Sequence, residues 1–439
     1  MDYEIKCTIS IKIQEDDLNI SRLIKAVQDF SKFVLAPQFL IMIIEAIDHY
    51  LLSILRSKSP KQYENRGYQK RQLQTSMGKL DLRFLKVKDL KTGLVNCPAK
   101  KLLGISNYIQ WSHETLVNCS GLLPFMSYRR SSLEFIEQHG YGPSKSVIHN
   151  RLAELVGTGE YQPDLKDKEY RYLLIDGTKA KFQDRSKETA AEIFYQGEVR
   201  FAYASIGEGK PFELVGLWVN KSWRECSKEL FGRLETDTLK VLICDGEESI
   251  AKAFLQPTMR LQRCQWHGAR ELKYILYADG VKKKEQFPIL SDLENIQMVG
   301  SRQETFEKLT EKDNTSLINI RDKIVSDIQD LAENTIGKGY VKAGTYLQNL
   351  AEPFVTCLDY YLETGKHIPI TSNIIERQIG LFKNRYSRVG RRWSEGGLLR
   401  WFAIAIRKLL PQFDWKKCWD DLLGAKDAVS LCLQTCLIT

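Results

Sequence analysis

Two apolar segments of the chain each lead directly into an aspartate and a glycine. Asp176 follows "YRYLLI" and Asp245 follows "KVLIC", and we expect each segment to be a buried strand that ends at its Asp-Gly pair. Because ligands gather at the carboxyl ends of strands in an open α/β sheet, the two carboxylates are expected to lie close together. Such a pair is suited to holding two cations about 3.5–4 Å apart, as phosphodiester chemistry requires. Asp-Gly is also a common turn, which remains the alternative for either pair alone.

A third acid lies in a strongly basic part of the chain. Residues 371–410 contain nine basic and two acidic residues, and Glu376 falls one turn into a helix expected to begin near Thr371 or Ser372. We predict that Glu376 completes the metal cluster and that its neighbours contact DNA phosphates or bases. These neighbours are Arg377, Lys383, Arg385, Arg388, Arg391, Arg392 and Trp393. The alternative for Glu376 is a charge that only complements the helix N-terminus.

A second candidate DNA-binding segment precedes the first aspartate. A helix is expected to end near Gly140, and Ser144 is a suitable N-cap for the helix "KSVIHNRLAEL" that follows. This layout is typical of a helix-turn-helix, although short helical hairpins also occur in proteins that do not bind DNA. The residues expected to face DNA are Arg129, Arg130, Lys145, His149, Asn150 and Arg151.

The order of the segments predicts an α/β fold. Three antiparallel strands, a helix and then strand-helix units are the order of a ribonuclease H-like mixed sheet, here interrupted by an all-α insertion. A small α+β region and the helix-turn-helix precede this core. The predicted divisions are 1–56 (strand plus helices), 57–105 (β-hairpin turning at Met77-Gly78), 106–160 (helix-turn-helix), 168–281 (core), 282–370 (helical insertion), 371–410 (last core helices) and 411–439 (tail).

Composition favours a soluble intracellular protein of several domains. The chain has 439 residues, a net charge of +9, and ten cysteines with no CxxC pair, which fits reduced thiols in a cytoplasm. The most apolar early segment, "FLIMIIEAIDHYLLSIL", contains Glu45 and Asp48, so we expect a buried amphipathic helix and no membrane span. Walker and dinucleotide motifs are absent from the sequence, so no nucleotide cofactor is expected.

Taken together, these residues resemble the DDE transposases, specifically the Mutator-like and related bacterial and archaeal insertion-sequence group. The resemblance lies in Asp176 of "LLIDGTK", Asp245 of "VLICDGEES", Cys264 and His267 of "CQWHGARELK", and Glu376 of "SNIIERQIGLFKNR". In that group a Cys-x-x-His pair follows the second aspartate, and a helical insertion precedes the final glutamate. The resemblance covers about residues 170–410.

The resemblance implies a nucleoid-associated transposase that binds the terminal inverted repeats of its element. Asp176, Asp245 and Glu376 would hold two Mg²⁺ or Mn²⁺ ions, and a freed 3′-hydroxyl would attack target DNA. Two DNA ends must be held together, so a homodimer or higher oligomer is expected on DNA. Cys264 and His267 are expected to border the active site, since a structural zinc needs four ligands.

Two other functions use the same residues. A ribonuclease H-like nuclease or resolvase would cut DNA with the same three acids and would not join the ends. A DNA-binding protein derived from a transposase would bind DNA without catalysis, and it would be expected to have lost one of the acids.

Overall fold

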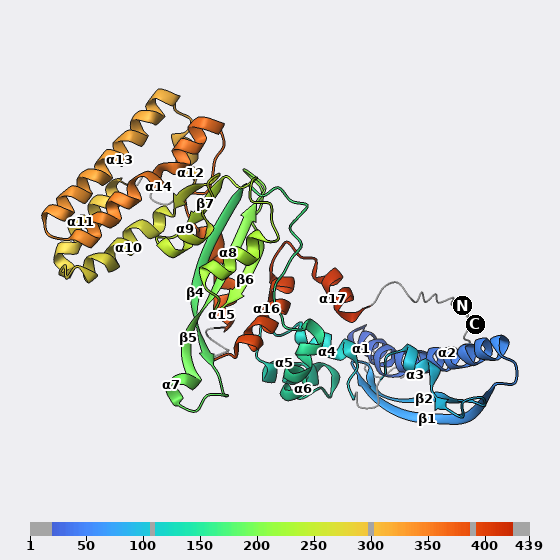
Figure 1. Ribbon diagram of the computed structural model, residues 1–439. Helices are drawn as coiled ribbons and strands as arrows, with labels where there is room; N and C mark the ends of the chain where they lie inside the picture. The colour runs from blue at the N-terminus through green and yellow to red at the C-terminus, as the bar shows by residue number, and fades with distance from the viewer. Residues whose placement is uncertain (1–19, 106–109, 297–302, 387–391, 425–439) are drawn as a thin grey trace. The chain divides into compact units, whose positions relative to one another are not determined.

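A computed structural model describes residues 20–105, 110–296, 303–386 and 392–424 (Figure 1). The chain forms two compact units, Met1–Leu155 with Lys416–Thr439, and Val156–Trp415. The strand expected in "YEIKCTISIKI" and most of the expected tail lie outside the described residues.

The first unit is built on a long β-hairpin. Strands β1 (Tyr63–Thr75) and β2 (Gly78–Asp89) pair antiparallel from the tight turn outward, and β3 (Val95–Asn96) adds a short third strand. The hairpin predicted at Met77-Gly78 is therefore confirmed. Apolar side chains of one hairpin face, among them Leu82 and Phe84, form a core with helix α2.

A long helical run precedes this hairpin. It comprises α1 (Ile20–Phe30), the π-helical turn η1 (Ser31–Leu35) and α2 (Ala36–Lys58). Of the helices in the described residues, this run alone is long and apolar enough to cross a membrane. In α2, however, Ile44, Asp48 and Leu52 form one buried stripe, and the Asp48 carboxylate accepts a 2.8 Å hydrogen bond from the Leu85 amide of β2. An amphipathic helix that packs one stripe on the hairpin is therefore confirmed, while the absence of a membrane span stays a prediction.

Short helices complete the first unit. They are α3 (Pro98–Leu102), α4 (His113–Ser120), α5 (Tyr128–His139), α6 (Lys145–Val156) and α17 (Trp415–Leu423). Gly140 ends α5 in the left-handed conformation at φ 78°, and the Ser144 hydroxyl accepts a hydrogen bond from the Val147 amide in the first turn of α6. The two helices and their end residues are as expected, while a helix-turn-helix that reads DNA stays a prediction.

The second unit contains a five-stranded mixed sheet in the order β6-β5-β4-β7-β8. The first three strands are antiparallel, and β4, β7 and β8 are parallel. Their bounds are β4 Tyr172–Gln183, β5 Phe194–Ser205, β6 Glu213–Val219, β7 Val241–Cys244 and β8 Arg260–Arg263. The chain is thus an α/β protein with a mixed sheet.

Strand β4 differs from the expectation at one point. It does not end at Asp176 but continues to Gln183, with Gly177 opposite Arg200 of β5. The antiparallel ladder with β5 extends it, whereas the parallel ladder with β7 stops at the pair Ile175 and Cys244. The prediction that this strand ends at Asp176 was wrong, because its pairing with β5 continues to Gln183.

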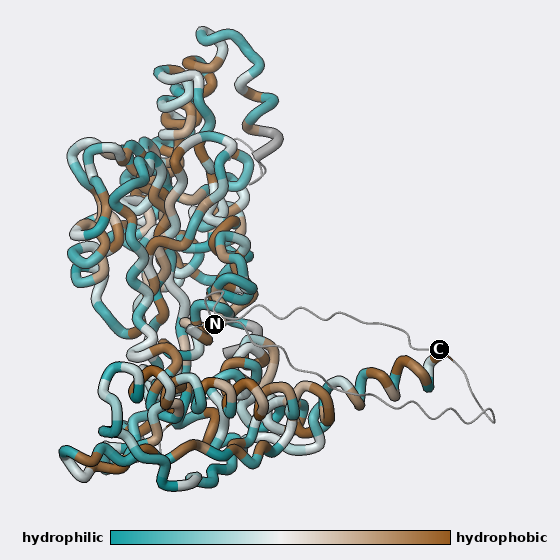
Figure 2. The backbone as a smooth tube through the Cα atoms, turned by 90° about the vertical axis from the view of Figure 1, so that its right-hand side faces the viewer, coloured by the Kyte–Doolittle hydropathy of each residue, from teal (hydrophilic) through white to brown (hydrophobic). Residues whose placement is uncertain are grey.

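Helices cover both faces of the sheet. On one face, Leu173, Ile175 and Leu242 pack against α8 (Trp223–Phe231) and α9 (Glu248–Phe254). On the other, Phe201 of β5 stacks on Phe382 of α15 (Asn373–Tyr386) and packs edge to face on Phe402 of α16 (Glu395–Leu409). Hydrophobic segments accordingly run through the interior of this unit (Figure 2).

All described residues between the last strand and α15 are helical or in connecting turns. The helices are α10 (Gln265–Ala278), α11 (Lys283–Ile296), α12 (Gln303–Leu309), α13 (Asn314–Gly337) and α14 (Val341–Thr364). Helix α14 lies along β8, where its Thr356 hydroxyl donates to the Leu261 carbonyl at 2.7 Å. The helical pair α13 and α14 is therefore anchored to the sheet edge (Figure 1).

Gly344 sets the distance between α13 and α14. A Cβ there would collide with Ile336 and lie 2.9 Å from the Ala332 carbonyl oxygen, so we expect Gly344→Ala to lower the free energy of unfolding by about 1–3 kcal/mol. Gly337→Ala, where a Cβ meets nothing within 4 Å, should raise it by up to about 1 kcal/mol. Thermal denaturation measures both, and equal effects of the two substitutions would contradict the close packing.

Candidate functional site

Asp176 and Asp245 occupy matching positions on neighbouring strands. The parallel pairing of β4 and β7 has Ile175 opposite Cys244; Asp176 is the next residue of β4, and Asp245 is the first residue after β7. Strand β8 continues the series, because Arg263 lies opposite Cys244 and is followed by Cys264. The Cys264 amide donates to the Cys244 carbonyl at 2.8 Å. The register therefore brings both predicted aspartates and the predicted cysteine together at the carboxyl ends of the parallel ladders of β4, β7 and β8.

Side-chain alternation turns both aspartates toward the same face of the sheet. Leu173 and Ile175 face α8 and α9, so Asp176 points to the opposite face, which α15 covers. Leu242 and Cys244 likewise face α8 and α9, so Asp245 also points away from them. Glu376 lies in the first turn of α15. The three predicted acids are thus on one side of the sheet.

His267 connects this face to Glu376. Its Nε2 lies 3.4 Å from the Glu376 Oε1, and its Nδ1 lies 3.3 Å from the Ser372 hydroxyl. The Ser372 hydroxyl is in turn 3.4 Å from the Glu376 Oε1. His267 and Ser372 are buried, whereas the Glu376 side chain is 36% exposed. The Glu376 carboxylate is therefore partly exposed to solvent, and its buried side contacts His267 and Ser372.

Cys264 joins the starts of two helices. Its sulfur accepts a 3.2 Å hydrogen bond from the Ser372 amide, and the Ser372 hydroxyl lies 3.3 Å from the same atom. The neighbouring Gln265 amide donates to the Ile370 carbonyl at 3.0 Å. These contacts fasten the start of α10 to the start of α15, so the Cys-x-x-His pair positions Glu376. Cys264 and His267 therefore lie beside the start of the Glu376 helix, and their role at the border of an active site stays a prediction.

The charges of the cluster act on one another. Burial first, and then the nearby Asp245, raise the pKa of Asp176 to about 7, although the Gly177 amide donates a 2.7 Å hydrogen bond to its carboxylate. Burial alone would lower the pKa of His267, but Cys264, Glu376 and Asp176 raise it above its ordinary value. Burial and the nearby Asp245 therefore disfavour the ionised Asp176 carboxylate more than the Gly177 amide and His267 favour it.

The donor set suits a hard divalent cation. Three carboxylates are oxygen ligands of the kind Mg²⁺ and Mn²⁺ take, and the raised pKa of Asp176 indicates uncompensated negative charge. Within the described ranges, no three His, Cys, Asp or Glu side chains stand close enough together to hold one ion in this conformation. The residues thus fit a metal by type and charge, and side-chain movement would be needed to complete its coordination.

Glu271 is a fourth acid that the sequence analysis missed. It follows His267 by one helical turn on α10, and a Cβ at Gly246 would lie 3.2 Å from its Cγ. Burial first, and then Asp245, raise the pKa of Glu271. The spacing of four residues after the histidine was a usable signal, but only the packing of Gly246 against α10 shows that Glu271 belongs to the site.

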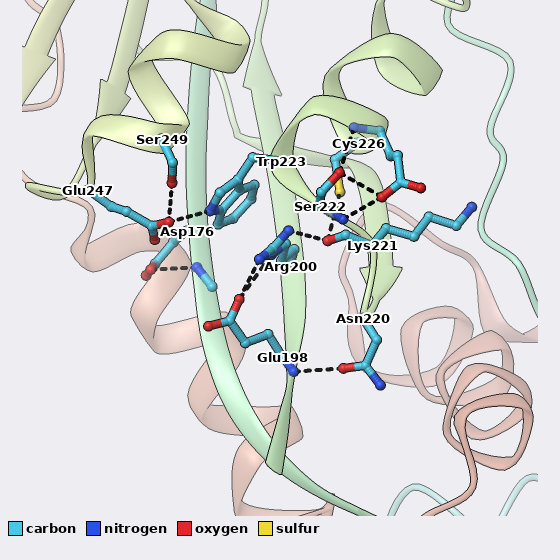
Figure 3. Close-up of polar contacts among 12 residues, drawn as sticks. Asp176, Glu198, Arg200, Asn220, Lys221, Ser222, Trp223, Cys226, Glu247 and Ser249 are labelled. Atoms are coloured by element: carbon cyan, nitrogen blue, oxygen red, sulfur yellow. Dashed lines mark hydrogen bonds and ion pairs between the residues drawn. The ribbon is translucent and has the colours of Figure 1, made fainter. Parts of the chain in front are cut away.

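Trp223 supports the loop that carries Asp245 (Figure 3). It packs against Gly177, and its Nε1 donates to the Glu247 carboxylate at 2.8 Å. The Glu247 amide donates to the Asp245 carboxylate at 3.0 Å. Arg200 lies over the Trp223 ring at 4.4 Å. One side chain of α8 therefore fixes the β7–α9 loop relative to β4, a relation that no local sequence pattern reveals.

A groove of about 380 Å³ adjoins Asp245. Gly246, after β7, and Arg263, at the end of β8, line one side of the groove, and the α14 residues Lys342, Tyr346 and Leu350 line the other. The Arg263 guanidinium donates to the Asp245 carbonyl. The helical insertion thus supplies one wall of a partly basic groove beside a candidate catalytic acid.

Three of the basic residues predicted around Glu376 belong with their side chains to the described part of the chain. Arg377, Lys383 and Arg392 are exposed, and the Arg392 guanidinium lies 3.8 Å from the centre of the Phe194 ring. The side chain of Arg385 and all of Arg388 and Arg391 lie outside the described residues.

Trp393 has a packing role in the structure. It is 8% exposed, its ring packs on Trp401 at 5.8 Å, and its amide donates to the Lys181 carbonyl of β4. The burial leaves little of the ring available for stacking on a base in this conformation, and the predicted DNA contact stays a prediction.

The other candidate DNA contacts lie in the first unit. The exposed ones are Arg129, Arg130, Lys145, His149 and Asn150. Arg151 is half-buried and forms a 2.7 Å ion pair with Glu154. Helix α6 therefore has a polar outer side of the predicted composition.

Comparison with solved structures gives a distant likeness. No protein-family model matches the chain, and no curated protein matches its sequence. Among solved structures, the chain is similar to the Drosophila P element transposase strand transfer complex, with a TM-score of 0.36 and 12% identity over 67% of this chain and 92% of that chain. A likeness this distant does not identify a family.

Replacing Asp176 by Asn should stabilise the metal-free protein. The folded-state pKa of Asp176 is about 7 against 3.8, so its favourable contribution is complete below pH 3.8 and is lost as the pH rises through 7. In EDTA, Asp176→Asn should therefore gain stability over wild type, on the order of 2 kcal/mol at pH 8 and near zero at pH 4. Thermal denaturation across this range tests it, with exposed Asp330→Asn as the control. A stability difference between Asp176→Asn and wild type that is the same at pH 4 and pH 8 would contradict the raised pKa of Asp176.

Ser372→Ala should weaken metal binding more than it weakens the fold. The hydroxyl that lies against Cys264, His267 and Glu376 is removed, and loss of such supporting contacts typically costs about 10-fold in metal affinity. Calorimetric titration with Mn²⁺ measures the affinity. As a control, Ser394→Ala removes the N-cap of α16, which should cost about 1 kcal/mol of stability and leave Mn²⁺ affinity unchanged. Wild-type affinity in Ser372→Ala would show that the contacts do not position Glu376.

Proposed function

We propose that the protein is a DDE-type DNA transposase that cuts and joins DNA strands in a metal-dependent reaction. The observation that carries the proposal is the register of β4 and β7, with Asp176 and Asp245 following an opposed pair and Glu376 entering from α15 on the same face. Acids on two neighbouring parallel strands and a covering helix are suited to phosphodiester chemistry.

Asp176, Asp245 and Glu376 would hold Mg²⁺ or Mn²⁺, two ions per site. Bound metal would activate the attacking oxygen and stabilise the leaving oxygen. The chain's own residues position these acids: His267 and Ser372 hold Glu376, and Trp223 holds the loop of Asp245 through Glu247. Arg263 and Lys342, against the single acid Glu248, give the lining of the adjoining groove a net positive charge suited to a phosphate backbone.

The strand order supports a ribonuclease H-like core for this transposase. Three antiparallel strands are followed by two parallel ones, and a helical segment separates the sheet from the helix of Glu376. The Cys-x-x-His pair lies after the second aspartate and touches the glutamate helix. These features support the proposal that the protein is related to the Mutator-like and related insertion-sequence transposases.

The partners proposed are DNA and further copies of the chain. The exposed polar side of α6 and the bases of α15 are suited to terminal inverted repeats and target DNA. Because two element ends are processed together, a homodimer or higher oligomer would act on DNA. The protein would work at the nucleoid in a prokaryotic cytoplasm, without a membrane or a nucleotide cofactor.

Glu376→Gln tests the proposal with a substitution that keeps size and removes charge. With Mg²⁺ or Mn²⁺ and DNA carrying the ends that flank the protein's own gene, wild type should cut and join. Glu376→Gln should lose at least about 10³-fold in rate, as expected when a group needed in the transition state is removed, while still binding the DNA. Glu333→Gln, the same change at an exposed position of α13, should leave the rate unchanged.

The products separate the possible functions. Joined strands support a transposase, and cleavage without joining supports a nuclease or resolvase. DNA binding without cleavage in wild type supports a DNA-binding protein. Equal cutting by wild type and Glu376→Gln would show that Glu376 is only a helix-end charge.

A further inference from the structure

Helix α10 has three large aromatic side chains on its solvent-facing side. Trp266, Tyr274 and Tyr277 are 52%, 60% and 79% exposed, although aromatic side chains of this size are found mainly in cores and interfaces. The buried residues of the same helix, among them Leu272 and Leu276, lie on its other side. The packing of α10 therefore does not account for the three rings, and exposed rings that gather in this way mark an interaction site.

Two basic residues lie among these rings. Arg270 and Lys273 are exposed, and they share with the rings an arc of about 100° on the helix. We call Trp266, Arg270, Lys273, Tyr274 and Tyr277 the α10 stripe. The one acid of α10, Glu271, lies off this arc, because its Cγ would be 3.2 Å from a Cβ at Gly246. The α10 stripe is thus aromatic and positively charged.

This composition differs from that of an ordinary amphipathic helix. Such a helix turns its apolar residues to the core and has charged and polar residues outside. In α10 the inner side has leucines and the outer side has rings interleaved with cations. Aromatic rings that stack on bases, next to cations that contact phosphates, make up the surfaces that bind unpaired nucleic acid. The stripe therefore matches a polyanion with exposed bases in both charge and shape.

The α10 stripe begins at the candidate site. Trp266 precedes His267 in the chain, and the Arg270 guanidinium lies 3.5 Å from the His267 Nε2, the atom that also contacts Glu376. From there α10 leads away from the sheet to α11 (Figure 1). Beyond the far end of α10, residues 282–284 are three exposed lysines. A strand on the stripe would therefore start beside the three acids and continue toward further positive charge.

We propose that the α10 stripe binds an unpaired DNA strand that leads away from the candidate site. Bases would stack on Trp266, Tyr274 and Tyr277, and Arg270 and Lys273 would contact the phosphates between them. The rings span about 16 Å along the helix, several times the rise of about 3.4 Å between stacked nucleotides. This role rests on the proposed function, because it names the form of DNA that the site would take.

Binding of a fluorescent oligothymidylate to the full-length protein tests this surface. Fluorescence anisotropy in EDTA measures the affinity without any cleavage, on an oligonucleotide of about 20 nucleotides. Trp266→Ala combined with Tyr274→Ala should raise the dissociation constant at least about 10-fold, because two stacked bases are lost. Tyr274→Phe, which keeps the ring, should bind like wild type. So should Ile318→Ala, which removes an apolar side chain that is 47% exposed on α13.

The phosphate contacts have a separate signature in salt. Lys273→Gln should lower the slope of log affinity against log salt concentration by about 0.7, the value for one phosphate of a single strand. Lys323→Gln, the same change at an exposed position of α13, should leave the slope unchanged. All of these variants alter exposed side chains, so they should keep the wild-type circular dichroism spectrum. A wild-type slope in Lys273→Gln would contradict the phosphate contact.

Three results would overturn the proposal. They are a wild type that does not bind oligothymidylate, which would leave the stripe to a protein partner, wild-type affinity in the double variant, and an equal loss of affinity for a blunt duplex, whose bases cannot stack on the rings. Glu376→Gln should bind oligothymidylate like wild type, because this binding needs no metal. Binding through the stripe without DNA cleavage would keep this role and reject the transposase, and cleavage without such binding would do the reverse.

Discussion

The candidate site depends on one short parallel ladder. Four residues of β4 pair with four residues of β7, and Asp176 and Asp245 each follow a member of the last pair, Ile175 with Cys244. A shift of one residue in this register would turn one aspartate to the face of α8 and α9, among apolar side chains. The burial of Leu173, Ile175, Leu242 and Cys244 opposes such a shift. Hydrophobic packing on one face of the sheet thus determines the positions of Asp176 and Asp245 on the other face.

Side chains from distant parts of the chain support Glu376. His267 of α10 and Ser372, just before α15, contact Glu376, and Cys264 contacts Ser372. The contact of Cys264 with Ser372 joins residues that are 108 positions apart in the sequence. The helical segment between α10 and α15 can therefore vary in length while the two helix starts stay fastened. It adds its own wall at Tyr346, next to the Asp245 loop.

Local patterns predicted much of this architecture. The hairpin turn, the end of α5 at Gly140, the strands before both aspartates and the helix of Glu376 are each encoded within a few neighbouring residues. Relations between distant segments were missed. Strand β4 passes Asp176 because β5 pairs with it, Trp393 is buried because it lies against β4 and Trp401, and Glu271 reaches the site because Gly246 has no side chain. The roles of the acids and of the DNA-facing bases stay predictions.

The uninterrupted pairing of β4 with β5, from Tyr172 to Gln183, gives the three acids unequal freedom. Asp176 sits within a continuous backbone ladder and has little room to shift. Asp245 leaves its strand into a turn, and Glu376 lies at the beginning of a helix, where backbone groups are less constrained. Any closing of the cluster around a cation is thus a movement of the Asp245 and Glu376 side chains, on segments that Trp223 and Cys264 hold, toward an aspartate on a continuous strand. The sheet therefore holds Asp176 in place, while the contacts of α8, α10 and α14 limit how far the other two acids can move.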